Sequence, residues 1–290
     1  MKGIILAGGA GTRLYPASLP ISKILLPVYN KPMIYYPLSV LMQAGIREIL
    51  IITTPNDNEN FKRVLGDGHQ WGIQLSYISQ QVKRGIADAF ILGKEFIGKD
   101  ACALILGDNL FYGSGFEALL SQATQQPFTG ATVFAYEVND PTRFGIVEFD
   151  KKGTAISLEE KPKNPRSNFA VTGLYFYDNQ VVQLAQTLQP SSRGELEITD
   201  LNRLYLERNL LHVFCLDRGF AWLDTGTHES VLEASNFVYT MQINQGIEIA
   251  CLEEIALAKN FITKKQLATQ LQNVPSNNYY DYLKKLLQRK

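Results

Sequence analysis

Residues 2–13 read KGIILAGGAGTR. The apolar start of this stretch predicts a buried strand, and Gly8, Gly9 and Gly11 follow it at once. Glycines in this place let the backbone come close to a ligand, and clustered N–H groups bind phosphate oxygens. Arg13 adds a permanent positive charge. The stretch predicts a phosphate-bearing ligand after the first strand, although a tight strand-to-helix turn would also favour these glycines.

Two familiar glycine patterns are absent from the sequence. The dinucleotide pattern G-x-G-x-x-G fails because Leu14 stands where its last glycine would be, and no G-x-x-x-x-G-K-[ST] run exists. What remains is G-G-x-G-T-R followed by Lys23. Backbone donors together with Arg and Lys side chains are suited to holding phosphates without either familiar motif.

Short apolar runs alternate with helical patterns through the first half of the chain. The runs predict strands at 4–7, 49–53, 74–79, 103–106 and 132–136. The stretches between them predict helices at 34–44, 57–65, 87–97 and 116–123. This alternation is typical of right-handed βαβ units, so we expect an α/β fold with a mainly parallel, Rossmann-like sheet and helices on both faces. Ligands of such sheets bind at the carboxyl ends of the strands.

The second half of the chain has a different pattern. It predicts a β-hairpin, a strand, a helix, a strand and a helix, at 143–160, 169–177, about 197 onward, 211–216 and 227–245. The tail carries an apolar stripe of Leu283, Leu286 and Leu287. We therefore expect one α/β domain with an antiparallel insertion, residues 1–245, and a helical C-terminal appendage packed on it, residues 246–290.

Composition narrows the class of protein. The 290 residues carry 28 basic and 28 acidic side chains, a balance that argues against coating nucleic acid or an anionic membrane. Cys102, Cys215 and Cys251 are far apart, so we expect reduced core residues rather than a disulfide or metal site. The first apolar run is too short for a signal peptide, and no run approaches the ~18 residues of a transmembrane helix. We expect a cytoplasmic protein.

Two aspartates follow apolar runs. Asp108 ends the run ALILGD, and Asp224 stands in AWLDTGTHES before the helix predicted from Thr227. Each has a plain alternative, because Gly-Asp-Asn is a turn signal and Asp224 would serve as the N-terminal cap of that helix. Mg²⁺ favours one or two carboxylates together with substrate phosphates. Without further help, the residues indicate an α/β enzyme that handles a phosphorylated nucleotide or sugar with Mg²⁺.

Longer blocks carry a family resemblance. LAGGAGTRLYP with SKILLPVYNKPMIYYPL resembles the signature of sugar-nucleotide pyrophosphorylases, which are nucleotidyltransferases. The blocks LGDNLFYG, VNDPTRFGIVEFD, RGELEITDLNR and AWLDTGTHESVLEASNF are similar to one branch, the glucose-1-phosphate thymidylyltransferases, over nearly the whole chain. The resemblance implies the short form of that enzyme, which joins dTTP and α-D-glucose 1-phosphate into dTDP-glucose and releases pyrophosphate. It also implies Mg²⁺ as cofactor and no side-chain nucleophile.

The resemblance implies a role for each matching residue. Arg13, Lys23 and Asp108 form the expected catalytic set, with Arg13 on the departing pyrophosphate and Lys23 on the α-phosphate and the incoming phosphate. Asp108 and Asp224 are expected to bind Mg²⁺. The implied nucleotide site comprises Leu6, Gly8, Gly9, Gly11, Thr12, Arg13, Gln80 and Gly85. The implied sugar-phosphate site comprises Lys23, Gly145, Glu160, Lys161, Val171, Arg193 and Trp222. Apart from the resemblance, residues 160–161 would be a solvated strand end, and Arg193 an ordinary loop charge beside first-turn acids.

The chain departs from many relatives near the positions that read the base. Where they have Gln-Pro-x-x-x-Gly-Leu-Ala-Gln-Ala, this chain has QQVKRGIADA, so Gln81, Ile86 and Asp88 replace Pro, Leu and Gln. Phe144 stands where a tyrosine is expected, which removes a hydroxyl contact. Thymine and uracil differ by one methyl group, which pockets discriminate by only ~1–3 kcal/mol, so we expect some use of UTP.

Other functions stay open on the sequence alone. A uridylyltransferase, or another pairing of nucleotide and sugar, would use the same scaffold. A regulatory relative that binds nucleotide sugars without turnover is a further alternative, against which the joint presence of Arg13, Lys23, Asp108 and Asp224 argues.

The resemblance has further implications for organisation and regulation. It implies a nucleotide half at about 1–137 and a sugar-phosphate half at about 138–226. It also implies a homotetramer with C-terminal helices at subunit contacts, and a second nucleotide site tied to feedback inhibition by dTDP-rhamnose. The pathway would be dTDP-L-rhamnose or other dTDP-sugar biosynthesis, with no nucleic acid or membrane partner.

Overall fold

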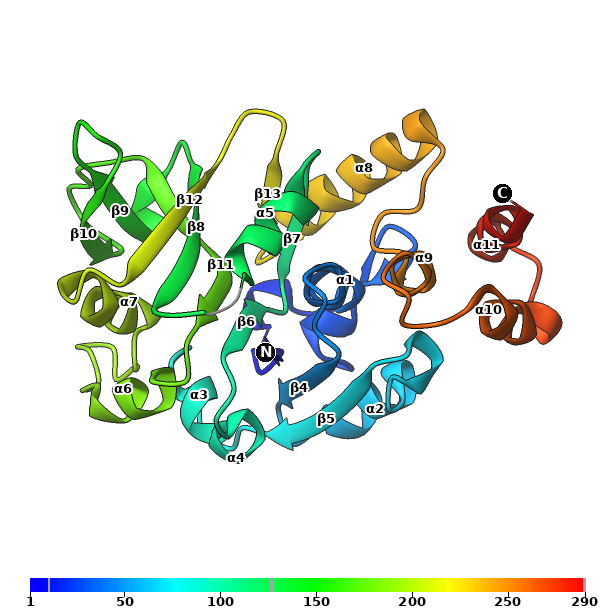
Figure 1. The fold of residues 1–290 in the computed structure, drawn as a ribbon, viewed down its shortest axis with the longest axis horizontal. Coiled ribbons are helices and arrows are strands. Elements are labelled where there is room, and N and C mark those ends of the chain that lie inside the picture. The colour runs from blue at the N-terminus through cyan, green and yellow to red at the C-terminus, as the bar shows by residue number, and fades with distance from the viewer. Residues whose placement is uncertain (10, 126–127, 289–290) are drawn as a thin grey trace.

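The computed structural model describes residues 1–9, 11–125 and 128–288 (Figure 1). Ala10 of the glycine-rich loop and residues 289–290 of the expected appendage lie outside the described residues. The strands are β1 (Lys2–Leu6), β2 (Pro27–Val28), β3 (Lys31–Pro32), β4 (Glu48–Thr53), β5 (Gln74–Ser79), β6 (Cys102–Leu106), β7 (Asn109–Tyr112), β8 (Ala131–Glu137), β9 (Gly145–Phe149), β10 (Ala155–Glu160), β11 (Phe169–Tyr177), β12 (Leu211–Leu216) and β13 (Ala221–Asp224). The α-helices are α1 (Tyr35–Gln43), α2 (Asn58–Leu65), α3 (Asp88–Leu92), α4 (Lys94–Ile97), α5 (Phe116–Ala123), α6 (Val181–Thr187), α7 (Ile198–Glu207), α8 (His228–Gln245), α9 (Leu252–Ala258), α10 (Lys264–Gln270) and α11 (Asn278–Gln288). Short 3-10 helices are η1 (Thr12–Leu14), η2 (Lys23–Leu25), η3 (His69–Trp71), η4 (Pro141–Arg143) and η5 (Leu271–Asn273).

A central sheet runs in the order β10-β9-β11-β6-β1-β4-β5, and β8 with β12 branches from β11. Strands β6, β1, β4 and β5 pair in parallel. Strand β11 instead pairs antiparallel with β6, β8 and β9, and β9 and β10 form the expected hairpin. The α/β fold with a mixed, mostly parallel central sheet, helices and an antiparallel insertion is confirmed.

Strands β1, β4 and β6 are mainly apolar because both faces of the sheet are covered there, whereas β5 at the end of the sheet carries Gln74, Ser76 and Ser79. Ile5 of β1 belongs to one core cluster with Ile49 and Ile51 of β4, and Ile4 belongs to the opposite cluster with Leu50. This alternation follows from side chains that point to opposite faces at successive positions of a strand. Since side chains on both faces of β1, β4 and β6 are buried, these three strands show no polar alternation that would mark a half-exposed strand.

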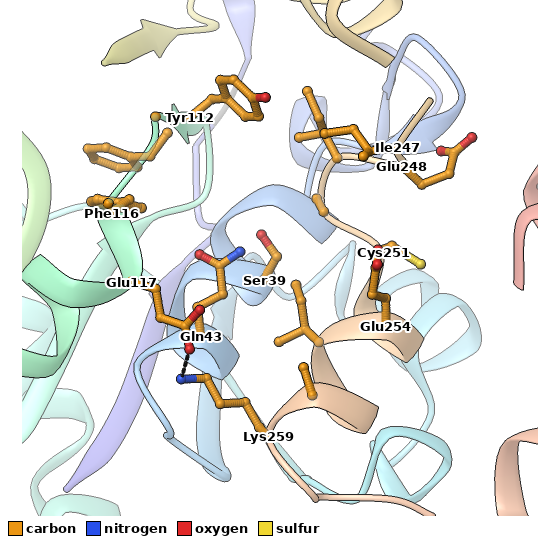
Figure 2. Close-up of a pocket in the computed structure, with 17 residues that line it drawn as sticks. Ser39, Gln43, Tyr112, Phe116, Glu117, Ile247, Glu248, Cys251, Glu254 and Lys259 are labelled. Carbon is orange, nitrogen blue, oxygen red and sulfur yellow. Dashed lines mark ion pairs between the residues drawn. The ribbon is translucent and has the colours of Figure 1, made fainter. Parts of the chain in front are cut away.

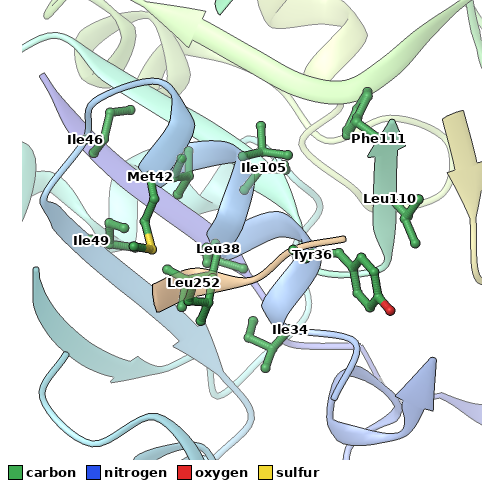
Figure 3. Packing of buried hydrophobic residues seen from close by; sticks show 14 of the residues in the cluster. Ile34, Tyr36, Leu38, Met42, Ile46, Ile49, Ile105, Leu110, Phe111 and Leu252 are labelled. Carbon is green, nitrogen blue, oxygen red and sulfur yellow. The ribbon is translucent and has the colours of Figure 1, made fainter. Parts of the chain in front are cut away.

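The C-terminal appendage joins the first of these cores. Figure 3 shows Leu252 of α9 beside Leu38 of α1, and Leu283 of α11 is buried in the same cluster. Lys31 of β3 adds a buried ion pair to Glu248, with 2.6 Å between Nζ and Oε2. These contacts place α9 and α11 on the α/β body, while the boundary between two domains stays a prediction.

Some elements differ from those predicted. The helix expected over 87–97 is wrong: it is two short helices, α3 and α4, separated at Gly93, where the backbone has ψ 5°. A Cβ on Gly93 would lie 3.2 Å from Ile4 Cδ1, so the interruption comes where the chain crosses the sheet closely. Helix α6, and the two-stranded sheet of β7 and β13, have no counterpart in the sequence prediction.

The prediction that all three cysteines are core residues is wrong for one of them. Cys102 and Cys251 are buried, but Cys215 is exposed. Its strand, β12, has β8 as its only partner within the described ranges and so forms an edge of the sheet. The apolar run around Cys215 could not reveal that edge position, because it depends on the order of strands. Separately, the described part of the chain contains no helix with the length and apolar character of a membrane span.

Candidate active site

The glycine-rich loop lies at the carboxyl end of β1 and packs against the side chains that follow it. A Cβ on Gly9 would lie 3.3 Å from Lys23 Cε, and a Cβ on Gly8 would lie 3.2 Å from Gln80 Oε1. Gly11 has φ 60° and starts η1, a conformation that glycine adopts at little cost. The lack of side chains therefore allows both a lysine and a glutamine to approach the loop backbone.

Lys23 and Asp108 form an ion pair at the centre of the site. Asp108 lies in the turn between β6 and β7, and β6 is the parallel neighbour of β1, with Leu6 beside Leu106. The carboxyl ends of two adjacent parallel strands thus bring the first loop and Asp108 together. The side chains of Lys23 and Asp108 are 11% and 17% exposed, so water screens their attraction only in part.

Asp224 lies next to Asp108 because β13 pairs with β7. Asp224 is opposite Asn109 in this pairing, and Thr225 holds the turn by donating from N and Oγ1 to the Asp108 carbonyl, at 3.0 and 2.7 Å. The capping alternative for Asp224 is wrong, since the hydroxyl of Thr227 caps α8. The turn at Asp108 is confirmed, and the same turn carries the carboxylate into the site.

The environment of Asp224 disfavours its charge. Burial raises the pKa of Asp224, and the nearby carboxylate of Asp108 raises it further, while Lys23, Arg13 and Arg143 act in the opposite direction. The two carboxylates therefore repel one another in a partly buried place. A cation bound between them would relieve that repulsion.

Asn109 supports this arrangement and was missed by sequence reasoning. Its Nδ2 donates to Asp108 Oδ1 at 3.1 Å, and its Oδ1 accepts from Trp222 Nε1 at 2.6 Å and from the Gly173 N–H at 3.2 Å. One buried amide thus fixes Asp108 on one side and the Trp222 indole on the other. Its partners come from β11 and β13, which no local pattern connects to residue 109.

Two adjoining cavities contain most of the predicted residues. The smaller, of about 220 Å³, is lined by Leu6, Gly8, Gly9, Lys23, Gln80 and Gly85 among others. The larger, of about 560 Å³, is lined by Arg13, Gly145, Glu160, Lys161, Val171, Arg193, Trp222 and Asp224 among others. Ile86, Leu106, Asp108 and Glu195 line both cavities. Gly11 and Thr12 of the predicted nucleotide site line neither.

The larger cavity has a carboxylate held in a fixed orientation. Glu160 at the end of β10 accepts from Thr199 Oγ1 at 2.5 Å and from Arg193 Nη2 at 3.1 Å. Arg193 also pairs at 2.8 Å with Glu197, which is 7% exposed. Glu197 is therefore a buried partner of Arg193 and not an ordinary first-turn acid. A Cβ on Gly145 would lie 2.7 Å from Thr199 Oγ1, so any side chain at this position would displace the Thr199 hydroxyl.

Two of the residues expected to differ from family relatives line these cavities: Ile86 lines both and Phe144 the larger, whereas Gln81 and Asp88 line neither. Phe144, in place of tyrosine, packs its ring 5.1 Å from that of Trp222. Lys83 lines the smaller cavity, where burial lowers its pKa, Lys23 lowers it further and Glu195 acts in the opposite direction. Lys83 therefore brings a second amine beside that of Lys23 in the smaller cavity. The sequence marks Lys83 as unusual in this loop but does not predict it as a residue of the site.

The donor set suits a hard cation that also binds phosphate. Among the described residues, no group of three or more His, Cys, Asp or Glu side chains could hold a metal ion. Asp108 and Asp224 supply two carboxylates, and their mutual repulsion favours a cation. Mg²⁺ accepts one or two carboxylates when substrate phosphates complete its shell. The residues present therefore fit Mg²⁺ bound together with a nucleotide.

A third cavity, separate from these two, lies away from this site. It has a volume of about 360 Å³ and is bounded by residues of α1, β7, α5 and the start of the appendage (Figure 2). Tyr112 lines one side and Ile247 the other. Glu117 pairs with Lys259 across it, with 2.5 Å between Oε1 and Nζ. The cavity therefore combines aromatic and apolar side chains, such as Tyr112 and Ile247, with the amine of Lys259.

Comparisons with known proteins agree with this architecture. The Nucleotidyl transferase family profile matches residues 2–241. A "Glucose-1-phosphate thymidylyltransferase" of Neisseria meningitidis is 59% identical over 100% of both chains, and one of Mycolicibacterium smegmatis is 52% identical over 100% of both.

Solved structures of nucleotidyltransferases are also similar to this chain in sequence and fold. A Bacillus anthracis protein described as a glucose-1-phosphate thymidylyltransferase, crystallised with sucrose, is 42% identical and superposes with a TM-score of 0.75. The match covers 82% of this chain and 94% of that one. A UDP-glucose pyrophosphorylase complexed with UDP-glucose is 26% identical, with a TM-score of 0.72 over 83% of this chain and 98% of that one.

Proposed function

The chain belongs to the nucleotidyl transferase family, and on that premise we propose that it is a glucose-1-phosphate thymidylyltransferase. It transfers the thymidylyl group of dTTP to α-D-glucose 1-phosphate, giving dTDP-glucose and pyrophosphate. Relatives named for this activity match the chain over its full length at 52–59% identity. The family sequence features, the fold and these relatives support the same reaction.

One observation carries the proposal. The smaller cavity has the glycine-rich loop and Gln80, the larger has Glu160 and Arg193, and Asp108 lines both. A nucleotide in the first and a sugar phosphate in the second would meet beside Lys23 and Asp108. Two substrates held at one boundary gain the advantage of proximity, which is the main source of rate in such transfers.

The reaction needs positioning and charge more than covalent catalysis. An oxygen of the sugar phosphate attacks the α-phosphorus of dTTP in line, and the bond from that phosphorus to the departing pyrophosphate breaks. Lys23 offsets charge on the α-phosphate and on the attacking phosphate, and Arg13 offsets charge on the pyrophosphate. A lysine 4 Å from a phosphate charge contributes about 4 kcal/mol at an effective dielectric of ~20. Glu160 accepts from the sugar hydroxyls.

Asp108 and Asp224 would hold Mg²⁺ in this proposal. The ion supplies charge neutralisation at the phosphate oxygens. Lys23 pairs with Asp108 in this structure. We therefore expect Lys23 to turn towards the phosphates when both substrates are bound.

Pyrophosphate release tests the proposal. The enzyme is supplied with glucose 1-phosphate, Mg²⁺ and in turn dTTP, UTP, CTP, ATP or GTP. We expect the fastest release with dTTP and slower release with UTP. No release with any nucleotide refutes the activity, and a clear preference for UTP favours the uridylyltransferase, the kind of enzyme that the 26% identical UDP-glucose pyrophosphorylase represents.

We propose the separate third cavity, of about 360 Å³, as the regulatory nucleotide-sugar site that the resemblance implies. Its aromatic side chain Tyr112 would contact a base, and Lys259 would attract phosphates. The ligand expected is dTDP-rhamnose, as an end product of the dTDP-L-rhamnose pathway. Lys259→Met should weaken that inhibition and leave the uninhibited rate unchanged. Inhibition as strong as in the unaltered enzyme would rule out this cavity as the regulatory site.

We also propose a homotetramer acting in the cytoplasm. Leu232, Tyr239 and Ile243 are exposed apolar side chains of α8, at 61%, 49% and 64% exposure. Apolar side chains gathered on one helix favour burial against another subunit. Sedimentation equilibrium gives the mass of the assembly, and a monomer at micromolar concentration would contradict the proposal.

A further inference from the structure

Asp88 is a buried carboxylate beside the nucleotide side of the site. It is 1% exposed, and its Oδ2 accepts from Gln80 Nε2 at 3.0 Å. Its Oδ1 accepts from Arg84 Nη2 at 2.6 Å. Asp88 lines neither cavity, whereas Gln80 lines the smaller one. Its contact with the nucleotide site therefore runs through Gln80.

This contact fixes which end of the Gln80 amide faces the cavity. An ionised carboxylate only accepts hydrogen bonds, so the group of Gln80 that meets Asp88 must be its NH₂. The carbonyl oxygen Oε1 is then turned the other way, to 3.2 Å from the place where a Cβ of Gly8 would stand. Gly8 and Gln80 both line the smaller cavity, so this oxygen lies at the wall of that cavity.

Backbone hydrogen bonds hold the segment that carries Arg84 and Asp88 in place. The Leu196 N–H donates to the Arg84 carbonyl at 2.6 Å, and the Ala87 N–H donates to the Leu196 carbonyl at 3.2 Å. Gly85 has φ +99°, and a Cβ there would lie 2.4 Å from Leu196 O. Although the chain lacks the proline that many relatives have nearby, backbone bonds to Leu196 restrain the segment.

We propose that Asp88 is a positioning residue for base selection. It holds Gln80 so that the side-chain carbonyl accepts from the N3–H of a pyrimidine base. Thymine and uracil have a hydrogen at N3, whereas cytosine has a lone pair there, which would face the lone pairs of Oε1. The inference rests on the proposed function, and it assigns Asp88 to the exclusion of cytosine and not to the distinction between thymine and uracil.

A carboxylate at position 88 fixes the orientation of the Gln80 amide more strictly than an amide side chain would. With the glutamine that many relatives have at position 88, two amides would face one another, and either could turn its donor or its acceptor to the other. With Asp88 only one orientation of Gln80 is satisfied, because the opposite one brings an oxygen against a carboxylate oxygen. The aspartate at position 88 thus restricts Gln80 to presenting its side-chain carbonyl, and not its NH₂ group, to the base.

The test compares kcat/KM for dTTP with kcat/KM for dCTP at saturating glucose 1-phosphate and Mg²⁺. Asp88→Asn keeps the size of the side chain but satisfies both orientations of Gln80, so the dTTP preference should fall by at least about tenfold. In a Gln80→Ala background, Asp88→Asn should leave the preference unchanged, because the residue acts through Gln80. Asp88→Ser, smaller and also able to donate or accept, provides a second variant.

A matched control comes from Asp178, which accepts from Gln180 Nε2 at 3.0 Å and lies outside both cavities. Asp178→Asn should leave the preference unchanged even if it lowers stability. A wild-type preference in both Asp88→Asn and Asp88→Ser overturns the inference, as does an equal fall in the Gln80→Ala background. Absence of turnover with dTTP in the unaltered protein would instead refute the proposed function.

Discussion

Replacing Thr199 by valine removes one hydroxyl from the wall of the larger cavity and changes little else. Thr199 Oγ1 donates to Glu160 Oε2 at 2.5 Å, and Thr199 is 3% exposed. Valine has the same shape, so the change isolates a hydrogen bond to a charged acceptor. We expect a weaker hold on the sugar and no direct effect on the nucleotide.

The size of the effect follows from the partners that remain. A hydrogen bond to a charged group contributes about 1.5–3 kcal/mol. Glu160 keeps its contact with Arg193 at 3.1 Å, and its side chain is 21% exposed, so water replaces part of the loss. The net cost is then about 1–2 kcal/mol, or about a 5–30-fold fall in kcat/KM for glucose 1-phosphate.

The assay varies each substrate in turn at a saturating concentration of the other. Thr199→Val should raise KM for glucose 1-phosphate and leave KM for dTTP within about twofold. Thr172→Val is the matched control, because Thr172 Oγ1 is fully buried and has no hydrogen-bond partner among the described residues. The control should keep both KM values and gain stability, since it removes an unsatisfied hydroxyl. An equal rise in KM for both substrates in Thr199→Val would refute the reasoning.

Three other predictions test separate parts of the account. Asp108→Asn should lower turnover by at least about 100-fold with little change in thermal midpoint, and near-normal pyrophosphate release would remove Asp108 from the site. Gly85→Ala should cost about 1–3 kcal/mol in urea unfolding, because φ +99° and the Leu196 carbonyl at 2.4 Å leave no room for a Cβ; an unchanged midpoint would contradict this. Partial desolvation, and after it the carboxylate of Asp217, raise the pKa of the surface thiol of Cys215. Alkylation of this thiol at pH 8 should therefore be slower than that of a free thiol, and its rate should increase as pH rises. Asp217→Asn should speed the reaction, and an unchanged rate would contradict the assigned cause.

Local patterns predicted much of the fold and the centre of the site. The segments at 74–79, 116–123 and 169–177 form elements with the bounds expected, because their apolar spacing matches their final burial. The first loop and Asp108 could be connected because each follows a strand of a parallel sheet, and such strands end at one edge. For these two features, the order of strands and loops along the sequence was enough to predict that they lie close together.

Other features depend on pairings between distant segments. Asn109 acts through Gly173 and Trp222, and no short-range pattern in the sequence brings these three residues together. The sequence identifies Asp88 only as a departure from family relatives, because it does not show the contact of Asp88 with Gln80. Cys215 was misplaced because the edge position of β12 is a property of the whole sheet. In each case the meaning of the residue comes from a partner that the sequence does not identify.

Isotope transfer tests the central claim most directly. Glucose 1-phosphate with ¹⁸O in its non-bridging phosphate oxygens is incubated with dTTP, Mg²⁺ and the protein, and the products are followed by ³¹P NMR. In-line attack by the sugar phosphate predicts that all the ¹⁸O enters dTDP-glucose, including the oxygen between its two phosphorus atoms, and that pyrophosphate carries none. Label in pyrophosphate, or no dTDP-glucose at all, would contradict the account.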